Sequence, residues 1–303
     1  AYSPDGITWT SGSNGTKMTI GNNVTWNDKL GNVTIQHPII ALGYGVNTIA
    51  YSLDGIKWTG LGSSIFFVAF SAAWNGTLWV AGGESNNGDY KKTLAYSYDG
   101  LNWVSLENTI FTFGGRCFSW NGTMWLAGSS YTTNTLAYSY DGKTWYGLGN
   151  STFDGHVRTI CWNGSFYIAG GGGSTSNTIA KSSDGIIWTG LSTTVFTNLC
   201  NCIAWNGTLF VAVGESDIGG HSVATSSDGI TWTGLNKTIF TVVGASIAWN
   251  GSLFVAVGSG VDSIATSPDG INWTGRGSTV FTSQGTSVCW SNNKWIATGD
   301  GTN

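Results

Sequence analysis

A nine-residue pattern, Ala-x-Ser-x-Asp-Gly-x-x-Trp, constrains the fold of this chain more than any other feature of its sequence. Its seven copies start at Ala1, Ala50, Ala95, Ala137, Ala180, Ala224 and Ala265. Self-similarity at a spacing of a few tens of residues indicates a solenoid, a propeller or another array. It therefore overrides the expectation of two domains that a length of 303 residues would otherwise suggest.

Each repeat holds four short segments with the alternation and the turn residues that are typical of β-strands. The Asp-Gly turn joins two of these segments. An Asn-Gly turn, as at Asn250, joins a strand that ends in Trp249 to the strand that follows. We expect type I′ turns with positive φ at both central residues, because Asn-Gly and Asp-Gly are the strongest short hairpin signals. The last repeat departs from the pattern, with the sequence 291–294 (Ser-Asn-Asn-Lys) in place of Asn-Gly.

The two ends of the chain are complementary fragments of one repeat. The chain opens with the last two strands of a repeat, Ala1 to Trp9, and closes with the first two, around Trp290 and Trp295. A linear solenoid would need atypical capping repeats, whereas these fragments can complete one blade together. We therefore predict an all-β fold: residues 1–303 form a single seven-bladed β-propeller of four-stranded antiparallel blades. The N- and C-terminal strands pair in one composite blade and close the ring.

The segment Ser-x-Asp-Gly-x-x-Trp resembles the Asp-box, or BNR repeat, of sialidases, sortilin-type receptors and other propellers. The resemblance implies that the motif lies on the turn between the two outer strands, that it is structural, and that it sits away from any active site. In physical terms, an Asp before Gly can accept backbone N–H groups in a turn, and the Trp presents a large ring to a neighbouring sheet. The matching positions are Asp5, Asp54, Asp99, Asp141, Asp184, Asp228 and Asp269, with Trp9, Trp58, Trp103, Trp145, Trp188, Trp232 and Trp273.

The catalytic residues of sialidases find no match in this chain. That family binds a substrate carboxylate with three arginines and uses a Tyr nucleophile with a Glu and an Asp. Here only three arginines occur, and Arg276 does not match the repeat position shared by Arg116 and Arg158. Other glycosidases need two carboxylates at a fixed separation, and no pattern selects a pair from the candidates Asp154, Glu215 and Asp217. We predict no catalytic residue and no enzyme, with an Asp-box glycoside hydrolase as one alternative.

Any binding site is expected on the face of the ring that carries the irregular loops. The regular Asn-Gly and Asp-Gly turns share one face, so the variable loops share the other, and variable loops are where function concentrates. The candidate ligand-binding residues, around the mouth of the central channel, are Arg116, Arg158, His156, Asp154, Glu84, Glu215, Asp217 and His221. The expected partner is a glycan or another protein. The alternative is that these are simply solvated polar residues of loops.

Composition excludes several other classes. Charged residues are only 9% and the net charge is −4, whereas a nucleic-acid surface needs clustered Lys and Arg. No apolar run approaches the roughly 18 residues of a membrane span, so we expect no membrane insertion. The three histidines, His37, His156 and His221, lie in different repeats without ligand spacing, so we predict no metal and no cofactor. The five cysteines are odd in number, which argues against a disulfide framework and favours small buried residues.

Asn-x-Ser/Thr sequons that we consider as glycosylation sites occur at Asn14, Asn23, Asn32, Asn75, Asn121, Asn150, Asn163, Asn206, Asn236 and Asn250. Five are the Asn-Gly hairpin turns that follow an inner-strand Trp, and turn chemistry alone explains these, although a secreted chain could carry glycans there. Low charge and dense sequons favour an extracellular protein or one on a particle surface, with a non-enzymatic binding or adhesion role. An architectural module of a larger surface or virion fibre assembly is the other alternative. A start at Ala1 rather than Met is compatible with a removed leader or with a fragment.

Overall fold

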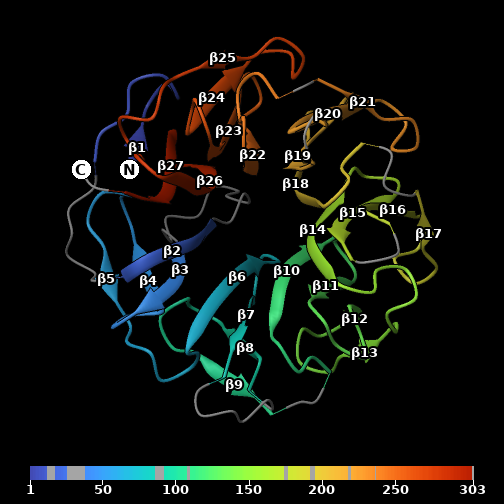
Figure 1. Ribbon diagram of the computed structural model, residues 1–303. Helices are drawn as coiled ribbons and strands as arrows, with labels where there is room; N and C mark the ends of the chain where they lie inside the picture. The colour runs from blue at the N-terminus through green and yellow to red at the C-terminus, as the bar shows by residue number, and fades with distance from the viewer. Residues whose placement is uncertain are drawn as a thin grey trace.

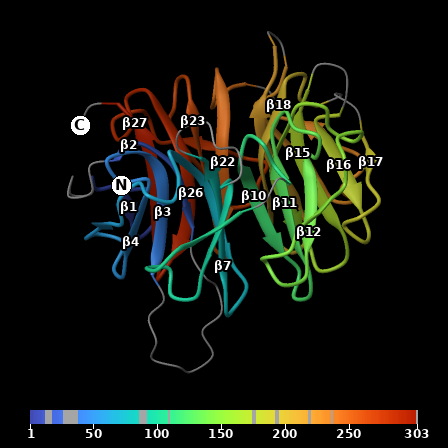
Figure 2. The same cartoon turned by 90° about the horizontal axis from the view of Figure 1, so that it is seen from below.

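The structure, a computed structural model, describes residues 1–11, 18–25, 38–85, 92–107, 110–173, 177–191, 195–217, 220–235 and 237–301. Every regular element within these ranges is a β-strand, and the strands form seven blades around a central axis (Figure 1). Seen from the side, the strands run between the two faces of the ring (Figure 2). The prediction of an all-β, seven-bladed β-propeller is confirmed.

The blades are numbered here I to VII from β2 onward. The first, innermost strands are β2 (Met18–Thr25), β6 (Val68–Trp74), β10 (Gly115–Trp120), β14 (His156–Trp162), β18 (Leu199–Trp205), β22 (Val243–Trp249) and β26 (Gln284–Ser291). The second strands are β3 (Ile39–Gly45), β7 (Trp79–Glu84), β11 (Trp125–Ser129), β15 (Tyr167–Gly172), β19 (Phe210–Glu215), β23 (Phe254–Ser259) and β27 (Lys294–Asp300). The third strands are β4 (Ile49–Ser52), β8 (Leu94–Ser97), β12 (Leu136–Ser139), β16 (Ile179–Ser182), β20 (Val223–Ser226), β24 (Ile264–Ser267) and β1 (Tyr2–Ser3). The outer strands are short: β5 (Thr59–Gly60), β9 (Val104–Leu106), β13 (Tyr146–Gly147), β17 (Thr189–Gly190), β21 (Thr233–Gly234) and β25 (Thr274–Gly275).

Blade VII is built from both ends of the chain, which lie side by side in Figure 1. β1 pairs antiparallel with β27, with Tyr2 opposite Ile296 and Ser3 opposite Trp295. β27 in turn pairs with the inner strand β26. Thr10 forms a bridge with Tyr2 at the position of an outer strand. The predicted closure of the ring by its terminal strands is therefore confirmed.

The Ser-x-Asp-Gly turns are held by their own side chains. In blade II, Ser97 Oγ donates to Asp99 Oδ1 (3.0 Å) and accepts the N–H of Gly100 (2.9 Å). Asp99 Oδ1 also accepts the N–H groups of Leu101 and Asn102, each at 2.8 Å. The same bonds recur in the other six blades. One carboxylate thus supplies the acceptor for turn N–H groups that have no backbone partner among the described residues.

The backbone of the turns differs from the predicted type I′ form. Gly251 has a φ of +99°, but Asn250 before it does not adopt positive φ, and the other Asn-Gly and Asp-Gly turns of the described residues behave alike. The reason is that Asn250 Oδ1 accepts the N–H groups two and three residues on, at 2.9 and 2.7 Å, and closes a longer turn. Positive φ at both central residues occurs instead at Asn292 and Asn293, where the repeat pattern is broken.

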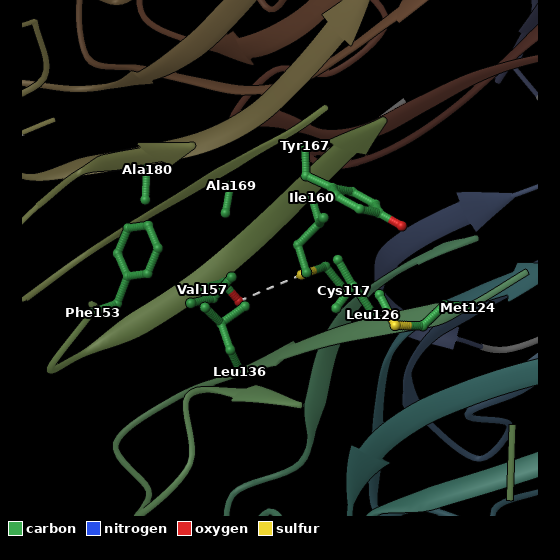
Figure 3. Close-up of a cluster of buried hydrophobic side chains, with 10 residues drawn as sticks. All are labelled: Cys117, Met124, Leu126, Leu136, Phe153, Val157, Ile160, Tyr167, Ala169 and Ala180. Carbon is green, nitrogen blue, oxygen red and sulfur yellow. Dashed lines mark hydrogen bonds between the residues drawn. The ribbon is translucent and has the colours of Figure 1, made fainter. Parts of the chain in front are cut away.

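Each interface between blades is filled by a cluster of buried apolar side chains. Figure 3 shows the cluster between blades III and IV, where Leu136 lies beside Val157 and Phe153. Trp188, from the Ser-x-Asp-Gly turn of blade IV, packs half-buried against this cluster. The corresponding Trp residues of the other six blades pack in the same way against the cluster shared with the preceding blade. The turns therefore stabilise the contact between neighbouring sheets.

Acid is expected to weaken these turns before it affects the rest of the fold. Partial desolvation raises the pKa of Asp99, but hydrogen bonds from Asn102 and Leu101 outweigh it and lower the pKa to about 2. The pKa of the other six turn aspartates is lowered as well. An unfolded Asp titrates near 3.9, so the unfolded chain binds protons first as the pH falls. The stabilisation is complete above about pH 5 and is lost as the pH falls through the folded pKa values.

Thermal unfolding measured from pH 7 to pH 2 tests this expectation. The midpoint should be nearly constant down to about pH 5 and then fall. Asp99→Asn should cost about 0.5–1 kcal/mol at pH 7, a small value because the carboxylate is exposed, and should show a shallower fall in acid. Glu107→Gln, at an exposed carboxylate outside the turns, serves as the control. An acid transition as steep in Asp99→Asn as in the parent would contradict a role for this carboxylate.

Candidate functional site

Every inner strand carries a β-bulge at the same position, four residues before the Trp that ends the strand in the repeat pattern. The register between first and second strands shifts there in all seven blades. A bulge leaves one residue out of the ladder and re-aims its side chain. The seven bulged residues, called here the bulge ring, are Asn22, Phe70, Arg116, Arg158, Asn201, Ala245 and Thr286.

All seven members of the bulge ring line one cavity of about 420 Å³ around the propeller axis. The inner strands surround this axis in Figure 1. The remaining lining residues are Asn23, Leu199, Cys202, Glu215, Val243, Ser246, Gln284 and Ser287. The antiparallel registers place the bulges at the strand ends remote from the Asn-Gly and Asp-Gly turns. The cavity therefore opens toward the irregular loops, and its wall is rich in amides and hydroxyl groups.

Several ring side chains bridge neighbouring blades. Asn22 Nδ2 donates to the carbonyl of Ala69 on the next blade at 3.0 Å, and Asn201 Nδ2 donates to that of Gly244 at 3.0 Å. Thr286 Oγ1 donates to a carbonyl of the first blade and so spans the ring closure. These contacts hold the ring side chains in place, which pre-organises the cavity wall for a ligand.

The two arginines lie on neighbouring inner strands, β10 and β14. The Arg116 guanidinium lies over the Phe70 ring, 4.1 Å from its centroid, and its Nε is buried without a hydrogen-bond partner among the described residues. Arg158 donates from Nη1 to Asn201 Oδ1 at 3.3 Å. Desolvation lowers the pKa of Arg116, and repulsion by Arg158 lowers it further. Arg158 reaches the solvent of the channel, yet desolvation by the surrounding walls lowers its pKa too.

His156 lies beside the arginines at the start of β14. Its Nδ1 is 2.8 Å from Ser130 Oγ, and its ring meets that of Tyr131 edge-on with centroids 4.3 Å apart. Tyr131 has a φ of +46°, one of three positive values outside glycine among the described residues. Burial lowers the pKa of His156 to about 4, and the charges of Arg158 and Arg116 act in the same direction. His156 is therefore neutral at physiological pH and adds no charge to the channel mouth.

The other predicted site residues are spread more widely. Glu215 ends β19 and lines the cavity, whereas Glu84 ends β7, outside the lining but close enough to act on the charge of Arg116. Asp217 is bound by Asn198 Nδ2 at 3.2 Å and by Thr197. Asp154 packs against Gly173. The structure thus brings together Arg116, Arg158, His156, Glu84 and Glu215, and it holds Asp217 and Asp154 in the loops.

His221 packs on Gly234 of an outer strand, away from the cavity. In other blades the same place against the outer-strand glycine is taken by Asn47, Asn134, Asn177 and Asp262. Asn47, Asn134 and Asp262 accept a backbone N–H two residues beyond that glycine, at 2.7–3.0 Å. His221 therefore occupies a repeat position of the fold, and any role in ligand binding stays a prediction.

Five members of the bulge ring were not singled out by sequence reasoning: Asn22, Phe70, Asn201, Ala245 and Thr286. Their signal was present, because each stands at the offset from the inner-strand Trp that Arg116 and Arg158 share. Only the arginines stood out in the sequence, because they are charged. The sequence pattern does not show that the backbone bulges at this offset.

The sequons fall in different environments. Asn75, Asn121, Asn163, Asn206 and Asn250 close the Asn-Gly turns. Asn23 lines the cavity and Asn150 is exposed. Asn14, Asn32 and Asn236 lie outside the described residues, as does His37. Glycosylation stays a prediction at every one of these positions.

The residues that the structure describes contain no group of three or more His, Cys, Asp or Glu side chains placed to hold a metal ion. No helix among them is long and apolar enough to cross a membrane. All five cysteines are free thiols, and burial raises the pKa of Cys117 and Cys161 to about 12.

The fold and the axial cavity define a β-propeller with a polar channel mouth. The model of the DUF6242 beta propeller domain matches residues 147–300, about half of the chain. This chain belongs to the DUF6242 beta propeller domain family. No curated protein matches it in sequence.

Solved structures of several different proteins share this fold. A GH74 enzyme from Niastella koreensis is 15% identical with a TM-score of 0.64; the match covers 86% of this chain, which spans only 45% of that one. YCF48 bound to D1 peptide is 14% identical with a TM-score of 0.65, covering 94% of this chain and 92% of that one. A streptogramin B lyase is 8% identical with a TM-score of 0.72, covering 93% and 95%. At these identities the similarity shows the fold alone.

Proposed function

We propose that this protein is a non-enzymatic binding propeller that recognises a glycan or a protein partner at the channel mouth. The observation that supports it most is the bulge ring, because one side chain from every blade lines a single cavity of about 420 Å³. A concave site with convergent polar groups is the usual form of a ligand site. The irregular loops around it offer further contacts to a larger partner. YCF48, which shares the fold, is a propeller solved with a peptide bound.

The absence of turnover is part of the proposal. Glycosidases of the two-carboxylate type need a pair of Asp or Glu side chains around the scissile bond. Among the described lining residues of the cavity, Glu215 is the single carboxylate. We further propose that the Ser-x-Asp-Gly turns are Asp-box repeats with a structural role, because their bonds lie within the turn and their Trp rings pack between blades. Exposure to an extracellular or particle-surface environment is proposed from the dense sequons.

A variant that fills the cavity tests the proposed site. Ala245 is the smallest member of the bulge ring, so Ala245→Phe places a phenyl ring in the cavity and leaves both arginines unchanged. Ligands found by a glycan array and a peptide array should bind the variant about tenfold more weakly or worse, ~1.4 kcal/mol. Ile187→Phe is the matched control, since Ile187 is 74% exposed on the turn face.

Two results would count against the proposal. Retention of full affinity in Ala245→Phe would place the ligand elsewhere on the surface. Turnover of any substrate in a panel of sialosides and other glycosides would contradict the non-enzymatic role. Unchanged melting temperatures of both Phe variants would show that loss of binding is not loss of folding.

A further inference from the structure

The bulge ring contains two guanidinium groups that are not in contact with a carboxylate in the described part of the chain. Among the residues that the structure describes, no carboxylate forms an ion pair with Arg116 or Arg158. The Arg116 guanidinium stacks on the Phe70 ring, and its Nε has no hydrogen-bond partner among the described residues. Arg158 donates one N–H to the amide oxygen of Asn201. A partly buried cation with unfilled donors is costly. The cost is removed when an oxyanion accepts the free N–H groups, because guanidinium forks match carboxylate geometry.

The surrounding charges limit the charge of such an anion. Glu84 acts on Arg116 and Glu215 acts on Arg158, each as a charge at a distance rather than a bonded partner. His156 is neutral, since burial and the arginines lower its pKa to about 4. Two positive groups and one negative group therefore line the cavity, and a second negative group, Glu84, lies outside the lining. A single negative charge can be bound by the arginines, whereas a second one would face the two glutamates without a further cation.

The rest of the wall indicates what the anion is attached to. Asn23 Oδ1 is buried and has no hydrogen-bond donor among the described residues. An acceptor of this kind requires a ligand that donates hydrogen bonds. Ser246, Gln284 and Ser287 add further amide and hydroxyl groups to the wall. A ligand with several hydroxyl groups satisfies this wall better than an apolar one.

From these contacts we infer that Arg116 and Arg158 bind the carboxylate of a hydroxylated monoanion, of the uronic acid class, whose hydroxyl groups pair with Asn23 and the facing amides. The inference rests on the proposed binding function and makes it specific. It predicts that the carboxylate, rather than the sugar ring alone, determines affinity. It also assigns the unfilled donor of Arg116 and the unfilled acceptor of Asn23 to one ligand.

D-Glucuronate, its uncharged methyl ester and glucose 6-phosphate are the probes for an NMR titration. Glucuronate should shift the Nε–Hε signals of Arg116 and Arg158 and leave that of Arg276 in place, because Arg276 is bonded to Thr266 on the third strand of its blade, β24. The methyl ester should bind about tenfold more weakly or worse, since it lacks the charge that makes these hydrogen bonds strong. Glucose 6-phosphate, with a second charge, should also bind more weakly.

Variants separate recognition from folding. Arg116→Gln and Arg158→Gln should each weaken glucuronate binding about tenfold or more, while Arg276→Gln serves as the control and keeps the parent affinity. The melting temperature of Arg158→Gln without ligand should be unchanged or higher, because the variant removes the repulsion that Arg158 exerts on the partly buried Arg116. A merely structural role of Arg158 would lower it instead.

The outcomes distinguish this inference from the binding function on which it rests. Equal affinity for glucuronate and its ester, tighter binding of glucose 6-phosphate, or no shift of either arginine signal would overturn the carboxylate assignment. If Ala245→Phe then still weakened binding of an uncharged ligand, the cavity would be supported as a binding site, but not as a site for a carboxylate. If no ligand responded to Ala245→Phe, the binding function itself would fall.

Discussion

Deletion of residues 1–10 is expected to lower the melting temperature by about 10 °C or more, or to abolish folding, the largest effect we predict. The deletion removes β1, Thr10 and Trp9 from blade VII. It uncovers Trp295 and Ile296, which are 0% and 2% exposed, and frees one edge of β27 for pairing with another chain. Truncation of a single buried aromatic residue costs about 3–5 kcal/mol. The loss of a strand together with its Trp should exceed that.

A circular permutant is the control for this deletion. Joining residue 303 to residue 1 through a short linker and opening the chain between β25 and β26 keeps every strand pairing. It should melt within a few degrees of the parent, measured by calorimetry and near-ultraviolet circular dichroism. A deletion variant as stable as the permutant would show that the terminal pairing contributes little to the ring.

Gly128→Val is expected to destabilise the protein by about 3 kcal/mol or more, through overpacking of the interface between blades III and IV. A Cβ atom on Gly128 would lie 2.6 Å from Cγ1 of Val157 and 2.6 Å from Sγ of Cys117. Both residues appear in Figure 3, where Cys117 bonds the Val157 carbonyl. A closely packed interior cannot admit two further methyl groups at such a contact without moving a strand.

The same place in other blade interfaces shows how the clash can be relieved. At each of these interfaces a glycine on one blade faces a larger residue on its neighbour: Gly128–Val157, Gly170–Cys200, Val213–Gly244, Val257–Gly285 and Thr298–Gly21. In the pair Gly128–Val157 the glycine is on the second strand and the valine on the inner strand, whereas in Val213–Gly244 the two residue types are exchanged. Adding Val157→Gly to Gly128→Val therefore reproduces an arrangement that the chain already uses two interfaces further on.

A double-mutant cycle in denaturant measures this complementarity. Val157→Gly alone should cost about 2–3 kcal/mol, because Val157 is fully buried. The double variant should be more stable than the sum of the two single changes by about 2 kcal/mol. Val257→Gly lies at a distant interface, so its combination with Gly128→Val should be additive. Additivity in both combinations would contradict a direct contact between Gly128 and Val157.

Repeat-level features of the fold were predictable from the sequence because they depend on local chemistry that recurs. The Asp-Gly and Asn-Gly signals delimit short strands, and the seven copies set the number of blades. The sequence fragments near the two ends of the chain complete one blade, and the pairing of Tyr2 with Ile296 agrees with this. Turn backbone was predicted less well, since Asp99 and Asn250 close their turns with side-chain oxygens rather than with a second left-handed residue.

The candidate site shows where sequence reasoning stopped. Arg116 and Arg158 stood out as charged residues at one repeat offset, while Asn22 and Ala245 at the same offset did not. His221 lies in an irregular loop segment, yet packing against Gly234 places it away from the cavity.

By itself the sequence determined the four strands of a blade, the number of blades and the closure of the ring. Each of these follows from residues that are close together in the chain or repeated along it. Only the tertiary structure decided which side chains meet. A bulge in each inner strand re-aims one residue per blade toward the axis, and seven residues about forty positions apart then line one cavity. The geometry of closing a ring brings them together, and no local pattern encodes it.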